Sequence, residues 1–277
     1  MVDFETGTET LLARREGHVA VLTFNRPERR NALTVDMYYG FREVLPQLAV
    51  DPEVRVVMVT GAGGAFCAGG DVKGMNESNQ SGQARVGQPD AYDDKIAFLR
   101  MRQRWVSQAL FDLPKPVVAA LPGPAAGAGL SMALAADLRV AAERALLVTA
   151  FANIGASGDF GGSWFLTQLL GAAKAKELYF TSPRMTAAEA AELGLVNEVF
   201  PDDTFDEEAL AYCHAIAAKA PIALRYMKEN INRAADVDLA TALDAEAVNM
   251  VRSMSTADHR EAAAAFVEKR TPTFDGR

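Results

Sequence analysis

The sequence predicts an α/β protein in which strands and helices alternate over residues 1–200 and a helical region fills residues 201–277. Two strongly apolar segments, 54–60 and 116–121, have the β-branched composition of buried strands. A glycine-rich turn follows each of them, and helical periodicity replaces the strand pattern after Pro201. The first region is therefore expected to form the core of the protein and the second a helical C-terminal part.

The remaining elements follow from periodicity and local signals. Alternating apolar residues predict a first strand at 17–24, which ends before Pro27. Apolar side chains at helical spacing predict a helix over 31–48. Thr186 and Glu189 have the spacing of a capping box, so a helix is expected to begin there and to stop at Gly194. The other expected elements are a polar excursion at 76–90, helices at 92–113 and 130–136, and strands at 138–142 and 196–200.

Composition excludes several classes of protein. The formal net charge is −8, which argues against a non-specific nucleic-acid binder. Cys67 and Cys213 are too far apart for a metal-ligand motif, and so few cysteines fit a reducing compartment. The first residues are polar and acidic, unlike a signal peptide, and no apolar run is long enough to cross a bilayer. We expect a cytoplasmic protein with no metal, no nucleic acid and no membrane partner.

The two glycine-rich loops, 61–70 and 123–129, are the first candidates for chemistry. Glycine lets a ligand approach the main chain closely, and a helix that starts after the loop adds unpaired N–H donors. Two such N–H groups aimed at one oxygen would form an oxyanion hole. Ordinary strand-to-helix turns have the same composition, so this pattern alone leaves both interpretations open. Neither loop matches a phosphate-binding P-loop or a dinucleotide fingerprint, and the segment 129–133 lacks the last glycine of a nucleophile elbow.

Four segments resemble one enzyme family. They are FCAGGDVK at 66–73, GPAAGAG at 123–129, NRPE at 25–28 with Asn31 and Ala32, and AFVEKR at 265–270. The first two resemble the two oxyanion segments of the crotonase (enoyl-CoA hydratase/isomerase) family, and the last two resemble its N-terminal and C-terminal motifs. The matches span nearly the whole chain, so chance similarity is improbable.

The resemblance implies a spiral of ββα units with a helical C-terminal region at a trimer interface. It implies an acyl-CoA substrate, a homo-trimer or a hexamer of two trimers, and no cofactor beyond the coenzyme A of the substrate. By resemblance, the N–H groups of Gly70 and Ala128 are the oxyanion donors. Lys73, Phe266 and Lys269 resemble residues that contact coenzyme A, the last two often across a subunit boundary. The alternative for the two lysines is a solvated surface charge.

The sequence departs from the hydratase pattern at both catalytic glutamates, where Ser131 and Phe151 stand. Neither residue is an acid–base group at neutral pH, whereas hydration requires a positioned water and the delivery of a proton. An acid appears instead at Asp159, and the segment 149–164 resembles the ring-1,2-epoxyphenylacetyl-CoA isomerase branch, which would imply phenylacetate catabolism. By that resemblance Asp159 shuttles a proton. The alternative is that Asp159 caps a helix that starts near Gly162.

Isomerisation also fits the chemistry of a single carboxylate, which can take a proton from C2 and return one at C4 while the oxyanion hole holds the charge. Apolar neighbours, with Phe151, Phe160 and Trp164 as candidates, would raise the pKa of Asp159 by desolvation. Two other functions stay open. One is a hydratase or another crotonase reaction, such as thioester hydrolysis or ring opening. The other is a non-catalytic acyl-CoA-binding protein.

Overall fold

The structure is a computed structural model that describes residues 2–71, 74, 76, 80, 89 and 91–277. Its main feature is a seven-stranded sheet. In spatial order the strands are β1 (Val2–Asp3), β2 (Leu11–Glu16), β3 (Val19–Phe24), β4 (Val56–Gly61), β5 (Val117–Leu121), β7 (Leu138–Ala142) and β10 (Glu198–Phe200). The expected α/β class is confirmed, and each of the strands predicted from the sequence is present within a few residues of its expected bounds.

Strand direction changes within this sheet. β1, β2 and β3 pair antiparallel, whereas β3, β4, β5, β7 and β10 are parallel. The carboxyl ends of parallel strands meet at one edge of a sheet, so the loops that follow β4 and β5 leave the sheet side by side. A second, three-stranded sheet consists of β6 (Ala125–Ala126), β8 (Leu146–Val148) and β9 (Met185–Thr186). It begins inside the second glycine-rich loop and ties that loop to the segment before Asp159.

The helices of this part of the chain pack against the main sheet or against one another. They are α1 (Val35–Val50), α3 (Tyr92–Gln103) with a π-helical turn η3 (Arg104–Gln108) and α4 (Ala109–Phe111), α5 (Ala128–Leu134), α6 (Gly162–Thr181) and α7 (Ala187–Glu192). Thr34 caps α1 by accepting from the Met37 N–H. The predicted capping box is confirmed at α7, where the Thr186 and Glu189 side chains each accept from the other's backbone N–H.

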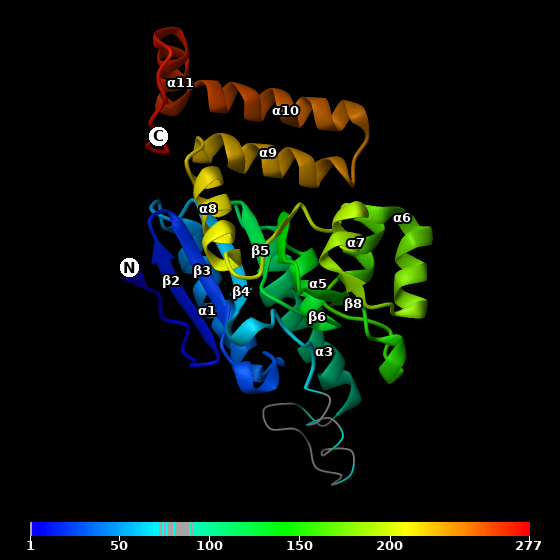
Figure 1. Cartoon of the computed structure of the whole chain (residues 1–277). Coiled ribbons are helices and arrows are strands. Elements are labelled where there is room, and N and C mark those ends of the chain that lie inside the picture. The colour runs from blue at the N-terminus through cyan, green and yellow to red at the C-terminus, as the bar shows by residue number, and fades with distance from the viewer. Residues whose placement is uncertain (1, 72–73, 75, 77–79, 81–88, 90) are drawn as a thin grey trace.

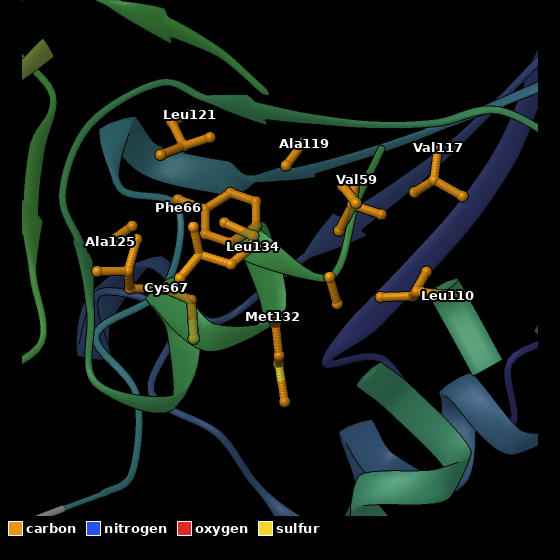
Figure 2. Close-up of a cluster of buried hydrophobic side chains, with 14 of the residues drawn as sticks. Val59, Phe66, Cys67, Leu110, Val117, Ala119, Leu121, Ala125, Met132 and Leu134 are labelled. Carbon is orange, nitrogen blue, oxygen red and sulfur yellow. The ribbon is translucent and has the colours of Figure 1, made fainter. Parts of the chain in front are cut away.

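The hydrophobic core lies directly under the two glycine-rich loops. Figure 2 shows Phe66 and Cys67 of the first loop beside Ala125 of the second and Leu134 of α5, with Ala119 and Leu121 of β5 above them. These side chains belong to one large buried cluster. Because the loops are anchored by core residues at both ends, their backbone positions are fixed by packing.

Four helices complete the chain: α8 (Phe205–Ala217), α9 (Pro221–Ala234), α10 (Leu239–Met254) and α11 (Ala257–Glu268). α8 packs its buried Phe205 and Cys213 against the outer face of the sheet. Figure 1 shows α9, α10 and α11 stacked beyond that sheet, with α11 and the C-terminus farthest from α3 and β6. The helical C-terminal region is confirmed, and the division of the chain at residue 200 stays a prediction. Among the described residues, no helix is both long and apolar enough to span a membrane.

Candidate active site

The two glycine-rich loops are in direct contact. The Ala126 N–H donates to Cys67 O at 2.9 Å, and the Phe66 N–H donates to Pro124 O at 3.1 Å. A Cβ on Gly129 would lie 2.3 Å from Cys67 O, so only glycine permits this approach. The two loops therefore form one packed unit and are not two independent strand-to-helix turns.

The ends of these loops carry available donors. Gly69 has a φ of +80°, and a Cβ there would lie 2.6 Å from Ala126 O and 3.2 Å from the Ala128 nitrogen. α5 begins at Ala128, whose N–H has no intrahelical acceptor. Within the part of the chain that the structure describes, neither the Gly70 nor the Ala128 N–H donates a hydrogen bond. Both groups have the chemistry of oxyanion donors, and their convergence on one oxygen stays a prediction.

The segment around Asn31 holds the first loop in place. Asn31 is fully buried, and its side-chain amide donates to Ala62 O at 2.9 Å and to Ala65 O at 2.8 Å. The neighbouring backbone continues the attachment, because the Leu33 N–H donates to Gly69 O at 2.8 Å. The N-terminal motif that carried part of the family resemblance is thus a support for the oxyanion loop.

An ion pair between Arg26 and Asp71 lies at the end of the first glycine-rich loop. Arg26 donates to Asp71 Oδ2 at 3.4 Å and to Ala32 O at 3.2 Å. The Gly74 N–H, followed by the charge of Arg26, lowers the pKa of Asp71 below its ordinary value although partial burial opposes them. Asp71 is accordingly ionised at neutral pH and fixes the end of the loop, and it is not suited to carry a proton.

Cys67 has the inert character expected for a packing residue. Its side chain is fully buried and burial raises the pKa of the thiol to about 12. Among the described residues no group of three or more histidine, cysteine, aspartate or glutamate side chains could hold a metal ion.

Asp159 is the acid with the clearest functional character. Burial raises the pKa of its carboxyl from 3.8 to about 6, and the positive charge of Arg102 works in the opposite direction. Its Oδ1 is buried and has no hydrogen-bond partner among the described residues. A buried carboxylate oxygen without a partner costs free energy, and groups perturbed in this way cluster at functional sites.

The structure does not support Asp159 as a helix cap. The N-cap residue of α6 is Gly161, and no side chain caps this helix. The turn is closed by the backbone, since the Gly162 N–H donates to the carbonyl oxygen of Asp159 at 3.2 Å. The capping interpretation of this side chain is wrong because the Asp159 carboxylate makes none of the bonds that define a cap.

Aromatic rings surround the Asp159 turn. Phe160 is buried and stacks on Tyr38 with ring centroids 5.5 Å apart, and its N–H is held by Gln103 at 3.0 Å. Arg102 lies over the same Tyr38 ring at 4.9 Å. Trp164 is partly exposed, contacts Phe111 and lines a cavity together with Phe160 and Gly161. Of the three expected neighbours, Phe160 lies in the turn itself. Phe151 stacks on Tyr179, whose ring lies beside Gly158 of the turn.

The positions of the two hydratase glutamates lie beside this turn and carry no acid. The Phe151 ring stacks on Tyr179 at 5.8 Å with an interplanar angle of 12°. Ser131 is buried, and its hydroxyl donates to Gly127 O at 3.3 Å. A Cβ on Gly162 would lie 2.3 Å from Ser131 Oγ and 2.6 Å from the Tyr179 hydroxyl, so these groups meet at the start of α6.

The residues expected to contact coenzyme A are not assembled within one chain. Lys73 and most of segment 76–90 lie outside the described residues. Phe266 is 85% exposed, and Lys269 ends α11 in a left-handed conformation. Figure 1 places α11 well away from β6 and α5, at the outer end of the stack of C-terminal helices. A role for Phe266 and Lys269 at the site therefore requires a neighbouring subunit.

Sequence reasoning missed Tyr179 and Arg102. Tyr179 lies 20 positions after Asp159, and its contacts depend on how the far part of α6 packs against α5. Arg102 is one of several basic residues on α3, and only tertiary structure selects it. No spacing rule connects either residue to Asp159, although a tyrosine or arginine predicted on a helix flanking an isolated acid would have been a reasonable candidate.

These features define an α/β protein in which two glycine-rich loops are in contact and a partly buried acid stands on the turn before α6. The chain belongs to the enoyl-CoA hydratase/isomerase family, whose model matches residues 14–277. It is 35% identical to the 1,2-epoxyphenylacetyl-CoA isomerase of Escherichia coli over 269 residues, 97% of this chain and 99% of that protein. It is also 35% identical to the short-chain-enoyl-CoA hydratase of Clostridium acetobutylicum over 261 residues, 94% of this chain and 95% of that protein.

Solved structures agree on the fold. A crystal structure of an enoyl-CoA hydratase from Polaromonas sp. JS666 superposes with a TM-score of 0.87 at 36% identity, covering 95% of this chain and 99% of that one. The crotonase fold expected from the four motifs is confirmed. The relatives include both hydratases and isomerases, so the family membership fixes the enzyme class and the choice of reaction depends on the site.

Proposed function

We propose that the protein is an enoyl-CoA isomerase that shifts a double bond, or isomerises a ring epoxide, in an acyl-CoA thioester. The observation that carries this proposal is the contrast between three positions. Ser131 and Phe151 replace the two acids of a hydratase, whereas Asp159 is a partly buried carboxyl whose pKa is raised to about 6. A site with one carboxylate of raised pKa suits proton transfer between two carbons better than addition of water.

The reaction would proceed through an enolate. The ionised Asp159 takes a proton from C2 of a 3-enoyl thioester, and the electrons move onto the thioester oxygen. The N–H groups of Gly70 and Ala128 would stabilise that charge, each contributing about 3 kcal/mol. Asp159 then returns the proton at C4. With a pKa of about 6 the carboxyl is mostly ionised at neutral pH and is still a stronger base than an ordinary aspartate.

The assembly we propose is a homo-trimer or a hexamer, in which Phe266 and Lys269 of one subunit meet the coenzyme A bound by another. Exposed apolar side chains on the C-terminal helices support a partner surface. They include Met227, Ile231, Leu239, Met250, Val251 and Phe266, each at least 56% exposed. Lys73 is proposed to meet coenzyme A from the first loop. We propose a cytoplasmic protein whose only partners are its substrate and its own copies, with no metal or further cofactor.

The test compares isomerisation and hydration in one set of variants. Asp159→Asn keeps the shape of the side chain and cannot take the C2 proton, so kcat for a 3-enoyl-CoA should fall by roughly 10² to 10⁴ with little change in the Kd for a coenzyme A ligand. The companion variant is Phe151→Glu, which restores an acid at the position matched to one of the two hydratase glutamates. A variant Asp159→Asn that keeps most of its activity would contradict the assignment.

A second candidate function is hydration, which the similarity to the Clostridium hydratase favours. The wild type separates the two, since a hydratase converts crotonyl-CoA to the 3-hydroxy product and an isomerase does not. Fast hydration without isomerisation would refute our proposal and would require a different group to position the water. Coenzyme A binding with no turnover of either substrate would favour the non-catalytic alternative.

A further inference from the structure

A chain of hydroxyl groups leads from α6 to the peptide that begins α5. The Ser131 hydroxyl donates to Gly127 O, which also accepts the Ser131 N–H at 3.0 Å. Gly127 O and the Ala128 N–H belong to one peptide group. Whatever holds this carbonyl therefore orients the N–H that our proposed function assigns to the thioester oxygen.

Tyr179 supplies the next member of the chain. Burial and the nearby charge of Asp159 raise the pKa of its phenol to about 12, while a side-chain hydrogen bond with Ser131 opposes that rise. The phenol is thus protonated at every working pH and remains a donor. Since the Ser131 proton is directed to Gly127 O, the Tyr179 hydroxyl, which meets Ser131 Oγ beside Gly162, can interact with that oxygen only as a donor.

The packing leaves the two hydroxyls little freedom. Gly162 provides the space in which they meet, because a Cβ there would lie 2.3 Å from Ser131 Oγ. The Tyr179 ring is stacked on Phe151 and passes close to Gly158, where a Cβ would lie 2.9 Å from its edge. The glycines at 158 and 162 flank the Asp159 turn, so the same residues that shape that turn also seat the tyrosine.

We propose that Ser131 and Tyr179 are positioning residues that fix and polarise the Gly127–Ala128 peptide for oxyanion binding. A hydrogen bond accepted by an amide carbonyl strengthens the bond that the same amide donates, because the two polarise one another. A serine that bonds the carbonyl four residues earlier is also a common packing feature of helices. The distinguishing property of this one is that its acceptor belongs to the oxyanion peptide and that a second hydroxyl stands behind it.

The inference rests on the proposed function, because it needs a thioester oxygen at Ala128. The direct probe is crotonyl-CoA labelled with ¹³C at the thioester carbonyl, bound to the full-length protein and read by infrared or NMR spectroscopy. Polarisation of the carbonyl by the oxyanion hole lowers its stretching frequency and moves its ¹³C shift. This readout reports hydrogen bonding to the oxygen and is insensitive to a general loss of folding stability, which thermal unfolding monitors separately.

The variants are Ser131→Ala and Tyr179→Phe, the latter keeping the stacked ring. Thr167→Ala is the matched control, because Thr167 on α6 also bonds the carbonyl four residues earlier, at 2.8 Å, and is exposed. Both test variants should lose part of the carbonyl shift and lower kcat by about three- to tenfold with KM unchanged, a fraction of the roughly 10²- to 10³-fold effect of losing a whole donor. Thr167→Ala should match the wild type.

The outcomes separate the inference from the function on which it rests. If the wild type shifts the carbonyl and both test variants shift it equally, the positioning role is overturned while the oxyanion hole stands. If the wild type itself leaves the carbonyl of bound crotonyl-CoA unshifted, the oxyanion assignment fails and the inference fails with it. A loss of shift in Ser131→Ala alone would remove Tyr179 from the chain and overturn the proposal as stated.

Discussion

The raised pKa of Asp159 should have a measurable effect on stability. A carboxyl whose pKa rises from 3.8 to about 6 on folding binds its proton more tightly in the folded than in the unfolded protein. Between these two pH values the folded state therefore holds more protons, and the free energy of unfolding falls as the pH rises. At about 1.4 kcal/mol per unit, the shift of roughly 2 units corresponds to about 3 kcal/mol of lost stability above pH 6.

Asp159→Asn removes this charge while conserving its size. The variant should be more stable than the wild type by about 1 to 3 kcal/mol at pH 7, the lower value allowing for an unpaired buried amide. The difference should shrink as the pH falls through 6 and disappear below about pH 4, where the wild-type carboxyl is neutral in both states. Urea unfolding followed by circular dichroism at pH values from 4 to 8 and one protein concentration measures this directly.

The same charge should control catalysis. The wild-type kcat/KM for a 3-enoyl-CoA should rise with pH and level off above an apparent pKa near 6, because the base must be ionised. A stability difference between Asp159→Asn and the wild type that is independent of pH would refute the reasoning. It would mean that the carboxyl is hydrated in the folded protein and that its environment does not prepare it as a base.

Three further predictions address the support of the site. Gly69→Ala places a Cβ 2.6 Å from Ala126 O at a φ of +80°, so we expect a loss of about 1 to 3 kcal/mol in unfolding free energy and at least tenfold in kcat; wild-type values for both would contradict the loop geometry. Arg102→Met removes the charge that lowers the pKa of Asp159, so the acid limb of the pH–rate profile should move upward, and a downward shift would exclude this role. Lys228 Nζ forms a 2.8 Å ion pair with Asp137 beneath α9, so Lys228→Met should lower the unfolding free energy in urea by about 3 kcal/mol. A much smaller loss would show that water solvates the pair.

The fold was predictable where one face of each element dominates its sequence. Strand β5 is apolar throughout and β4 is apolar except at Thr60, and both were located within two residues of their bounds. Strand β2, with the sequence LLARRE, escaped notice because Leu12 is apolar yet exposed and three charged residues follow Ala13, so polar and apolar residues do not alternate. Helix α7 was found from its capping box, a local signal that tertiary packing does not alter.

The site was predictable only in part, because some of its residues carry a sequence signal and others are brought in only by tertiary packing. Composition located the glycine loops and the resemblance located Asp159, but local chemistry could not choose between a base and a cap for Asp159. The choice depends on whether the Gly161–Gly162 backbone closes the turn by itself, which it does. Tyr179 depends on the packing of α6 over α5, and such long-range contacts leave no periodic trace in a sequence.

The absence of the two hydratase acids and the raised pKa of Asp159 are physically connected. A carboxylate at position 151 would be ionised beside the Tyr179 ring and would draw water toward the Asp159 turn. Phe151 instead stacks an apolar ring on Tyr179, and Phe160, the residue after Asp159, is buried. Little water can therefore solvate Oδ1 of Asp159. An enzyme that adds water must bring it to the substrate, whereas one that carries a proton from C2 to C4 must prevent water from protonating the enolate first. The dryness that raises the pKa of Asp159 is therefore the same property that would keep an intermediate on the path to isomerisation.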